Sequence, residues 1–205
     1  MGTSMACLLA TIYYSYHEET KLLPTYQHQP LVPNQPPALL LYARLIDDSV
    51  QVWDTAYMPP NMKQNLKKHI SKAMSFGQLE WEVEEPSRQV NFLDLTITLE
   101  PNGNITTKTY VKPINLHLYI DPSSSHSKGV LKSLIYGTIM RYWKQNTYLK
   151  DFVHITKNFY RHLLNRGYPS ETLTPLFQEA GPTITVRNQG LDCVTAPPYF
   201  AQHTV

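Results

Sequence analysis

Apolar residues recur along this chain at two different spacings, and the spacing changes from one segment to the next. A spacing of three or four residues, which is typical of one helix face, occurs over residues 5–16, 62–73, 130–142 and 152–163. Between these segments, apolar residues form short runs or alternate with polar ones, which is typical of strands. The order predicts a helix, a hairpin, a helix, further antiparallel strands and a final helical region, and therefore an α+β fold.

Residues that favour tight turns interrupt the strand-like segments. The apolar runs Leu39–Tyr42 and Val50–Trp53 flank the sequence Ile46-Asp47-Asp48-Ser49. From Leu93 to Val111 two alternating segments are separated by Pro101-Asn102-Gly103-Asn104. Both arrangements predict β-hairpins.

In the last third of the chain, apolar residues first follow a helical spacing and then show no regular spacing. Gly167 directly follows the second of the late helical segments, where it suits the left-handed position that ends many helices. Beyond it, scattered prolines and the lack of a period predict a poorly ordered tail. We therefore expect three parts, which are residues 1–112, 113–170 and 171–205.

Charge changes sign along the chain. Residues 1–104 hold 7 Lys and Arg against 11 Asp and Glu, whereas residues 105–170 hold 10 against 2. An acidic region followed by a basic one suggests metal chemistry beside a polyanion. Two distant cysteines argue against a disulfide scaffold, and no apolar run is long enough to cross a bilayer. We expect an intracellular protein, nuclear or cytoplasmic, with no membrane partner.

Asp47 and Asp48 are adjacent acids between apolar runs, with Arg44 three residues before the first of them. Burying an unpaired carboxylate costs several kcal/mol. At a hairpin turn both side chains can lean toward one point, where their oxygens suit a hard cation such as Mg²⁺. A pair of such ions can activate a hydroxyl and stabilise a leaving pyrophosphate, but normally needs a third carboxylate. The alternative is that both acids merely occupy a solvated turn.

Four stretches, taken in order, resemble those of reverse transcriptases. "YARLIDDSV" resembles the catalytic aspartate hairpin, and "MGTSMACLLATIYYSYHEE" the segment that precedes it. "VNFLDLTITLEPNGNITTKTYVKP" is similar to the following strands, which include the primer grip. "HLYIDPSSSHSKGVLKSLIYGTIMRYW", with "NFYRHLLNRGYP" after it, looks like the thumb of retroelement enzymes of the Penelope-like or related non-LTR kinds.

The resemblance implies a partial polymerase palm over residues 1–112 and a helical thumb over 113–170. It implies RNA-templated DNA synthesis with two Mg²⁺ (or Mn²⁺), acting on deoxynucleotides and an RNA or DNA template–primer. Residue by residue, it makes Asp47 and Asp48 the catalytic metal ligands. It also assigns a template and nucleotide pocket to Gly2, Thr3 and Met5, and the primer grip to Phe92, Leu93 and Asp94.

The sequence departs from the family pattern in two places. Leu45 stands two positions before the first aspartate, where the family usually has an aromatic residue, commonly Tyr. The family's remaining metal-binding aspartate lies upstream of the Gly-Thr segment, and neither Asp54 nor Asp94 has that role in the family. We therefore expect a fragment with part of the metal site, weak metal binding, and little or no polymerase activity alone.

The basic region supports a second hypothesis of a different class. The first late helical segment carries a predicted nucleic-acid-binding stripe made of Lys128, Lys132, Tyr136, Arg141 and Lys144. Lys157, Arg161 and Arg166 add charge to the second segment. A non-catalytic nucleic-acid-binding remnant would have this property without the aspartate chemistry. An unrelated α+β scaffold with solvated helix faces is the third alternative.

Overall fold

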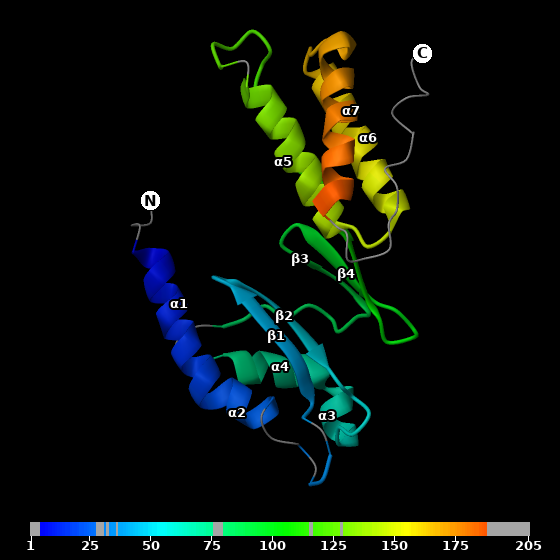
Figure 1. The fold of residues 1–205 in the computed structure, drawn as a ribbon. Coiled ribbons are helices and arrows are strands. Elements are labelled where there is room, and N and C mark those ends of the chain that lie inside the picture. Colours follow the sequence, from blue (N-terminus) through cyan, green and yellow to red (C-terminus); the bar gives the residue numbers. More distant parts are fainter. Residues whose placement is uncertain are drawn as a thin grey trace. The chain divides into compact units, whose positions relative to one another are not determined.

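A computed structural model describes residues 5–27, 31, 33–35, 37–75, 80–114, 117–127 and 129–187 (Figure 1). The chain divides into two compact units, Met1–Arg88 and Gln89–Val205. Two antiparallel sheets, one of two and one of three strands, precede a group of packed helices. The α+β class predicted from the sequence is therefore confirmed. The division falls at residue 88, whereas the sequence pattern placed it at residue 112.

The first unit packs helices against a hairpin. Its elements are α1 (Ala6–His17), the π-helical turn η1 (Glu18–Leu22), α2 (Leu23–Tyr26), β1 (Leu39–Leu45), β2 (Asp48–Trp53), α3 (Pro60–Gln64) and α4 (Leu66–Met74). Leu66, Ile70 and Met74 recur every four residues, so one face of α4 is apolar. These three side chains are buried in one cluster with Leu22, against which Trp53 of the hairpin also packs.

The second unit begins with the sheet β3–β4–β5. Its strands are β3 (Gln89–Phe92), β4 (Leu95–Leu99) and β5 (Ile105–Thr109). The predicted hairpin is confirmed, since Leu99 pairs with Ile105 across a turn in which Gly103 has φ +86°. Leu93 was predicted to begin a strand, but it lies in a two-residue turn with φ +55°.

The loop after α5 (Gly129–Gln145) covers the outer edge of β5. The Thr107 N–H donates to Thr147 Oγ1 at 2.9 Å, and the Thr147 N–H donates back to the Thr107 carbonyl at 2.9 Å. The Thr109 N–H donates to Asn146 Oδ1 at 3.0 Å. These bonds satisfy an otherwise open strand edge and join the sheet to the helices. They explain why β3–β5 belong with the helices and not with the first hairpin.

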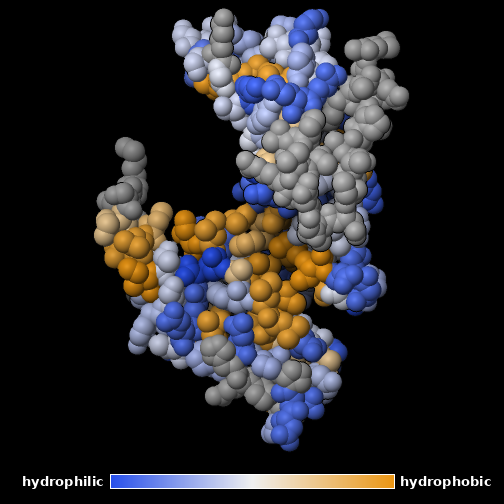
Figure 2. Space-filling view, viewed as in Figure 1, coloured by the Kyte–Doolittle hydropathy of each residue, from blue (hydrophilic) through white to orange (hydrophobic). Residues whose placement is uncertain are grey.

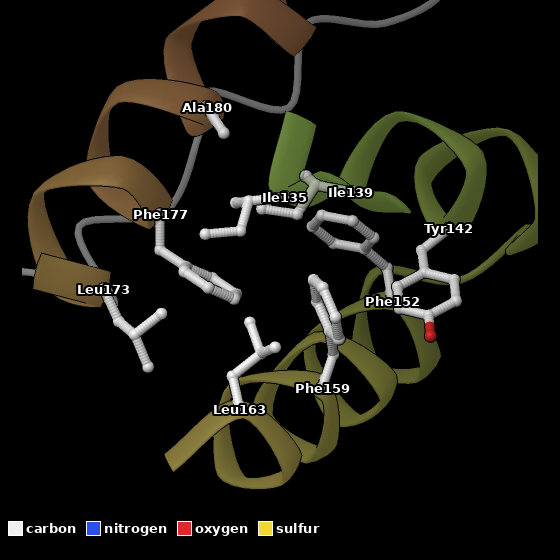
Figure 3. Close-up of a cluster of buried hydrophobic side chains, with 9 residues drawn as sticks. All are labelled: Ile135, Ile139, Tyr142, Phe152, Phe159, Leu163, Leu173, Phe177 and Ala180. Carbon is white, nitrogen blue, oxygen red and sulfur yellow. The ribbon is translucent and has the colours of Figure 1, made fainter. Parts of the chain in front are cut away.

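Three helices enclose the main hydrophobic core (Figure 3). They are α5, α6 (Leu149–Asn165) and α7 (Ser170–Arg187). Each helix contributes three buried side chains, which are Ile135, Ile139, Tyr142, Phe152, Phe159, Leu163, Leu173, Phe177 and Ala180. The sequence predicted the first two helices but gave the segment from residue 171 to a poorly ordered tail. Its residues up to Arg187 are instead helical, because Leu173, Phe177 and Ala180 bury one face of α7.

The turn between α6 and α7 ends α6 as predicted. Gly167 has φ +103°, and its N–H donates to the Leu164 carbonyl at 2.9 Å. The Tyr168 N–H donates to the Leu163 carbonyl at 3.2 Å. This pair of bonds is the Schellman motif, which needs a left-handed residue at the position of Gly167.

Candidate functional site

Asp47 and Asp48 lie at the tip of the β1–β2 hairpin. Leu45 pairs with Asp48, so Ile46 and Asp47 form a two-residue turn and Asp48 begins β2. Both carboxylates are exposed. Among the residues that the structure describes, none forms a hydrogen bond or ion pair with either carboxylate. Both are therefore available to a cation from solvent.

Ile46 holds the turn in a strained backbone conformation. Its φ is +56°, a region in which a β-branched residue is an outlier. Two-residue hairpin turns with a positive φ at this first position normally use glycine there. Such a conformation costs about 1–3 kcal/mol and persists only where the surrounding structure imposes it. Strain of this kind is concentrated at functional sites, which favours a role for the turn.

The Arg44 side chain holds the turn through a hydrogen bond and an ion pair. Its side chain is 7% exposed and that of Glu18 is 12% exposed. Arg44 Nε donates to Glu18 Oε1, and Nη2 donates to Oε2 at 3.2 Å. Nη1 donates to the carbonyl of the strained Ile46 at 2.9 Å. A partly buried, two-pronged ion pair thus ties the turn to the helix that carries Glu18.

The same ion pair joins the hairpin to α1 and η1. Tyr42 Oη donates to Glu18 Oε1 at 2.6 Å, and Arg44 Nη2 donates to Ser15 Oγ at 3.3 Å. The Arg44 guanidinium lies 5.1 Å from the ring centre of Tyr14. Burial and the hydrogen bond to Glu18 raise the pKa of Tyr42. Tyr42 therefore remains a neutral donor, and the carboxylate has donors for both of its oxygens.

The acids at the tip are too few for a complete two-ion site. In the described ranges, no group of three or more His, Cys, Asp or Glu side chains could hold a metal ion. Asp54 accepts from the Ala56 N–H at 2.8 Å, and Asp94 is paired with Arg141 at 3.7 Å. Two carboxylates are fewer than the ligand set that two-metal nucleotidyl transfer needs.

The remaining positions implied by the resemblance are spread over both units. Met5 directly precedes α1 and is exposed, while Gly2 and Thr3 lie outside the described residues. Phe92, Leu93 and Asp94 form the end of β3 and the turn before β4. Like the turn at Ile46 and Asp47, this turn has an apolar residue of positive φ followed by an aspartate.

The predicted basic stripe falls on α5 from Lys132 to Lys144, and the fold pairs part of this α5 stripe with acids. Lys132 Nζ donates to Glu179 of α7 at 2.9 Å and lies 5.3 Å from the ring centre of Tyr136. Arg141 is paired with Asp94. Lys144 is exposed, and Lys128 lies outside the described residues. Sequence reasoning missed Glu179 because it lies 47 residues from Lys132, beyond any local pattern.

An exposed apolar surface covers α1 and the neighbouring hairpin (Figure 2). The helical spacing in residues 5–16 predicted one apolar helix face, but most of that face is not buried. The exposed apolar residues of α1 and β1 with its turn are Leu8, Leu9, Ile12, Tyr13, Tyr16, Leu40, Leu41, Leu45 and Ile46. Contiguous exposed apolar surfaces of this kind commonly mark contacts with other structure.

Comparison with known proteins gives no match. No protein-family model, curated protein or solved structure matches it. None of the helices in the described part of the chain has the length and apolar character needed to cross a membrane. Function is therefore inferred from the residues and geometry of the chain itself.

Proposed function

We propose that this chain is part of a retroelement reverse transcriptase of the Penelope-like or a related non-LTR kind. In this proposal the β1–β2 hairpin belongs to the polymerase palm, and α5–α7 form the thumb. The intact enzyme would extend a primer on an RNA template by nucleotidyl transfer, with Mg²⁺ or Mn²⁺ as cofactor. Its partners would be the template–primer and deoxynucleotides.

The observation that carries this proposal is the anchored turn of the β1–β2 hairpin. Asp47 and Asp48 follow a strained residue whose carbonyl accepts a hydrogen bond from the partly buried Arg44. A solvated turn without a function needs neither a strained isoleucine nor a shielded ion pair that holds it. Two exposed carboxylates on a fixed turn suit a hard cation, because the turn limits the entropy lost on binding.

The test of the palm assignment is Mn²⁺ binding at the turn, measured as paramagnetic broadening of backbone amide resonances. Residues 46–49 are expected to broaden first in the full chain, and Asp47→Asn plus Asp48→Asn should remove the effect. The matched control is Glu82→Gln plus Glu84→Gln, which removes two exposed acids from the same unit. Equal broadening in the aspartate variant, or none in the parent chain, would count against the palm.

Primer extension tests the level of activity. The described residues offer two carboxylates at the turn, fewer than a two-metal site needs. Little or no primer extension is therefore expected from this chain alone with Mg²⁺ or Mn²⁺. Robust extension that disappears in Asp47→Ala would overturn that expectation and show that the chain is catalytically sufficient.

A non-catalytic nucleic-acid-binding protein is the second candidate. It is favoured by the excess of 8 positive charges in residues 105–170 together with the incomplete acidic set. This function requires salt-dependent binding to a primer–template duplex that is unchanged by Asp47→Ala. Absence of binding at low salt would contradict both candidates.

A further inference from the structure

The helix α1 has a polar side toward the hairpin and an apolar side toward solvent. Ser15 of α1 and Glu18, which directly follows the helix, accept hydrogen bonds from Arg44 of the hairpin. The opposite side carries four apolar residues that are between 51% and 71% exposed, and we name them the α1 face: Leu8, Leu9, Ile12 and Tyr16. A helix at the surface of a globular protein normally has the reverse orientation, with its apolar side in the core.

The α1 face has the spacing of a surface that packs against another helix. Leu8, Ile12 and Tyr16 are four residues apart and form one ridge along the helix, with Leu9 beside it. Ridges of this spacing pack into the grooves of a second helix, most commonly at a crossing angle of about −50°. Single exposed apolar residues are common on proteins, but contiguous ones mark a contact. The apolar surface of α1 in Figure 2 is therefore suited to a partner helix.

We infer that the α1 face binds the α1 face of a second copy of this chain, forming a dimer with two-fold symmetry. In such a dimer both copies use the same surface. With about 200 Å² for a fully exposed residue of this size, the four residues offer about 500 Å² on each copy, or about 1,000 Å² in the dimer. This area reaches the lower bound of about 1,000 Å² for a specific interface.

The hairpin tip enlarges the apolar surface next to α1. Arg44 donates to the Thr11 carbonyl at 3.4 Å and to the Ile46 carbonyl at 2.9 Å, so the turn lies beside the middle of the helix. Ile46 is itself exposed. Apolar area beyond the four residues of the α1 face is therefore available to the same partner.

The absence of charge on α1 favours a second copy over other partners. No Asp, Glu, Lys or Arg occurs from Ala6 to His17, so two such helices meet without repulsion between like charges. A nucleic acid is bound through cations, and a helix that lies on a membrane surface is rich in Lys and Arg beside its apolar face. Complementary charges commonly select a different protein partner. The α1 face has none of these features, and contact with its own copy requires none of them.

Sedimentation equilibrium of the full chain, over a range of protein concentrations, is the experiment. The molar mass is expected to rise from that of one chain to that of two as the concentration increases. The test variant is Ile12→Lys plus Tyr16→Lys, which brings like charges together in the contact and should weaken dimerisation more than about tenfold. Both side chains are more than half exposed in the single chain, so its own fold tolerates the change.

Two further variants separate the face from the added charge. Tyr57→Lys plus Ile114→Lys replaces the same two residue types at exposed positions outside α1, and should change dimerisation less than about twofold. Ile12→Ala plus Tyr16→Ala adds no charge and favours the helix, and it should also weaken the dimer. Unchanged circular dichroism would show that each variant is folded.

A mixing experiment tests whether the α1 face contacts itself. Ile12→Glu plus Tyr16→Glu should be as monomeric as the lysine variant, because like charges again meet. An equimolar mixture of the lysine and glutamate variants places opposite charges across the same contact, and should form dimers. A mixture that stays monomeric while the parent chain dimerises would mean that the two faces do not meet.

Each other outcome also decides the point. A parent chain that is monomeric at every concentration, or a lysine variant that dimerises as well as the parent, would overturn the inference. Open-ended assemblies would show a contact without two-fold symmetry, and would overturn it too. Binding of a monomeric parent chain to phosphatidylcholine vesicles, lost in the lysine variant, would show that a membrane covers the face instead. Dimerisation is separate from the proposed nucleic-acid function, which none of these results would contradict.

Discussion

Arg44 and Glu18 form a partly buried, two-pronged ion pair that connects the β1–β2 hairpin to the helix preceding it. Glu18 is the first residue of the π-helical turn η1, where the helix widens by one residue. From the same guanidinium, Nη1 reaches the Ile46 carbonyl. The helix, the ion pair and the carboxylate turn are therefore structurally coupled. A change in any of them should alter the conformation of Asp47.

Breaking this ion pair should destabilise the first unit strongly. Arg44→Ala leaves the partly buried Glu18 carboxylate without its main donor, and loss of a hydrogen bond between charged groups costs about 1.5–3 kcal/mol. Urea unfolding should report the loss, with amide hydrogen exchange in β1 and β2 placing it in the hairpin. Lys21→Ala, on the exposed side of η1, is the control and should change the free energy of unfolding by less than about 0.5 kcal/mol.

The two changes should not add. Arg44→Ala combined with Glu18→Ala removes both charges, so the double variant should lose clearly less than the sum of the single losses. Additive losses would show that the two side chains act independently, and would remove the ion pair as the anchor of the turn.

Glycine at position 46 should relieve the strain in the turn. Ile46→Gly allows the positive φ without a steric penalty, and the loss of a side chain that is 38% exposed offsets part of that gain. We expect the hairpin to gain about 1 kcal/mol in amide exchange stability. Ile46→Val keeps the β-branch and should give no gain. A loss of stability in Ile46→Gly would mean that the isoleucine packs more than it strains.

The sequence pattern predicted the features that depend on residues close together in the chain. The hairpins around Asp47 and Gly103, the helices α5 and α6, and the role of Gly167 all follow from spacing and turn chemistry. The turn at Leu93 was missed because Leu93, Leu95 and Ile97 alternate as a single strand would. Only the pairing of Phe92 with Leu95 distinguishes the two cases.

Features made by distant residues were beyond a reading of local pattern. α7 contains Pro175 and Pro182, which read as helix breakers, yet Leu173 and Phe177 fill the core and hold the segment helical. The net charge along the α5 stripe depends on Glu179, which lies on α7 and forms an ion pair with Lys132. Tertiary burial and pairing thus overrode local propensity at both places.

Core packing by α7 should be essential to the helical group. Phe177 is 1% exposed, and its ring lies 5.5 Å from that of Phe159 and 5.0 Å from that of Tyr160. Phe177→Ala should cost about 3–5 kcal/mol, because it leaves a cavity among these rings. Thermal unfolding followed by circular dichroism is the measurement, and the exposed Thr172→Ala is the control. A tolerated Phe177→Ala would show that α7 is peripheral.

Stability of the second unit should depend on pH through His117 and His162. Their rings are stacked with centres 3.9 Å apart, and Arg166 is close by, held to the Tyr119 carbonyl at 2.8 Å and 3.7 Å from Asp121. Burial and the charge of His117 lower the pKa of His162 below its ordinary 6.5. The unfolded chain therefore binds a proton more readily than the folded chain does.

The sign of the pH effect follows from that difference. The contribution to stability is fully present above about pH 6.5 and is lost as the pH falls through the lowered pKa of His162. Urea unfolding between pH 5 and pH 8, followed by the backbone amide resonances of α6, should show the decline on the acid side. His162→Gln should flatten the profile, and His117→Asn, which tolerates the positive φ of 49° at that position, should reduce its slope. His154→Gln, on the exposed side of α6, should leave the profile unchanged.

A decline that persists in His162→Gln would assign the effect to groups other than the stacked pair of His117 and His162.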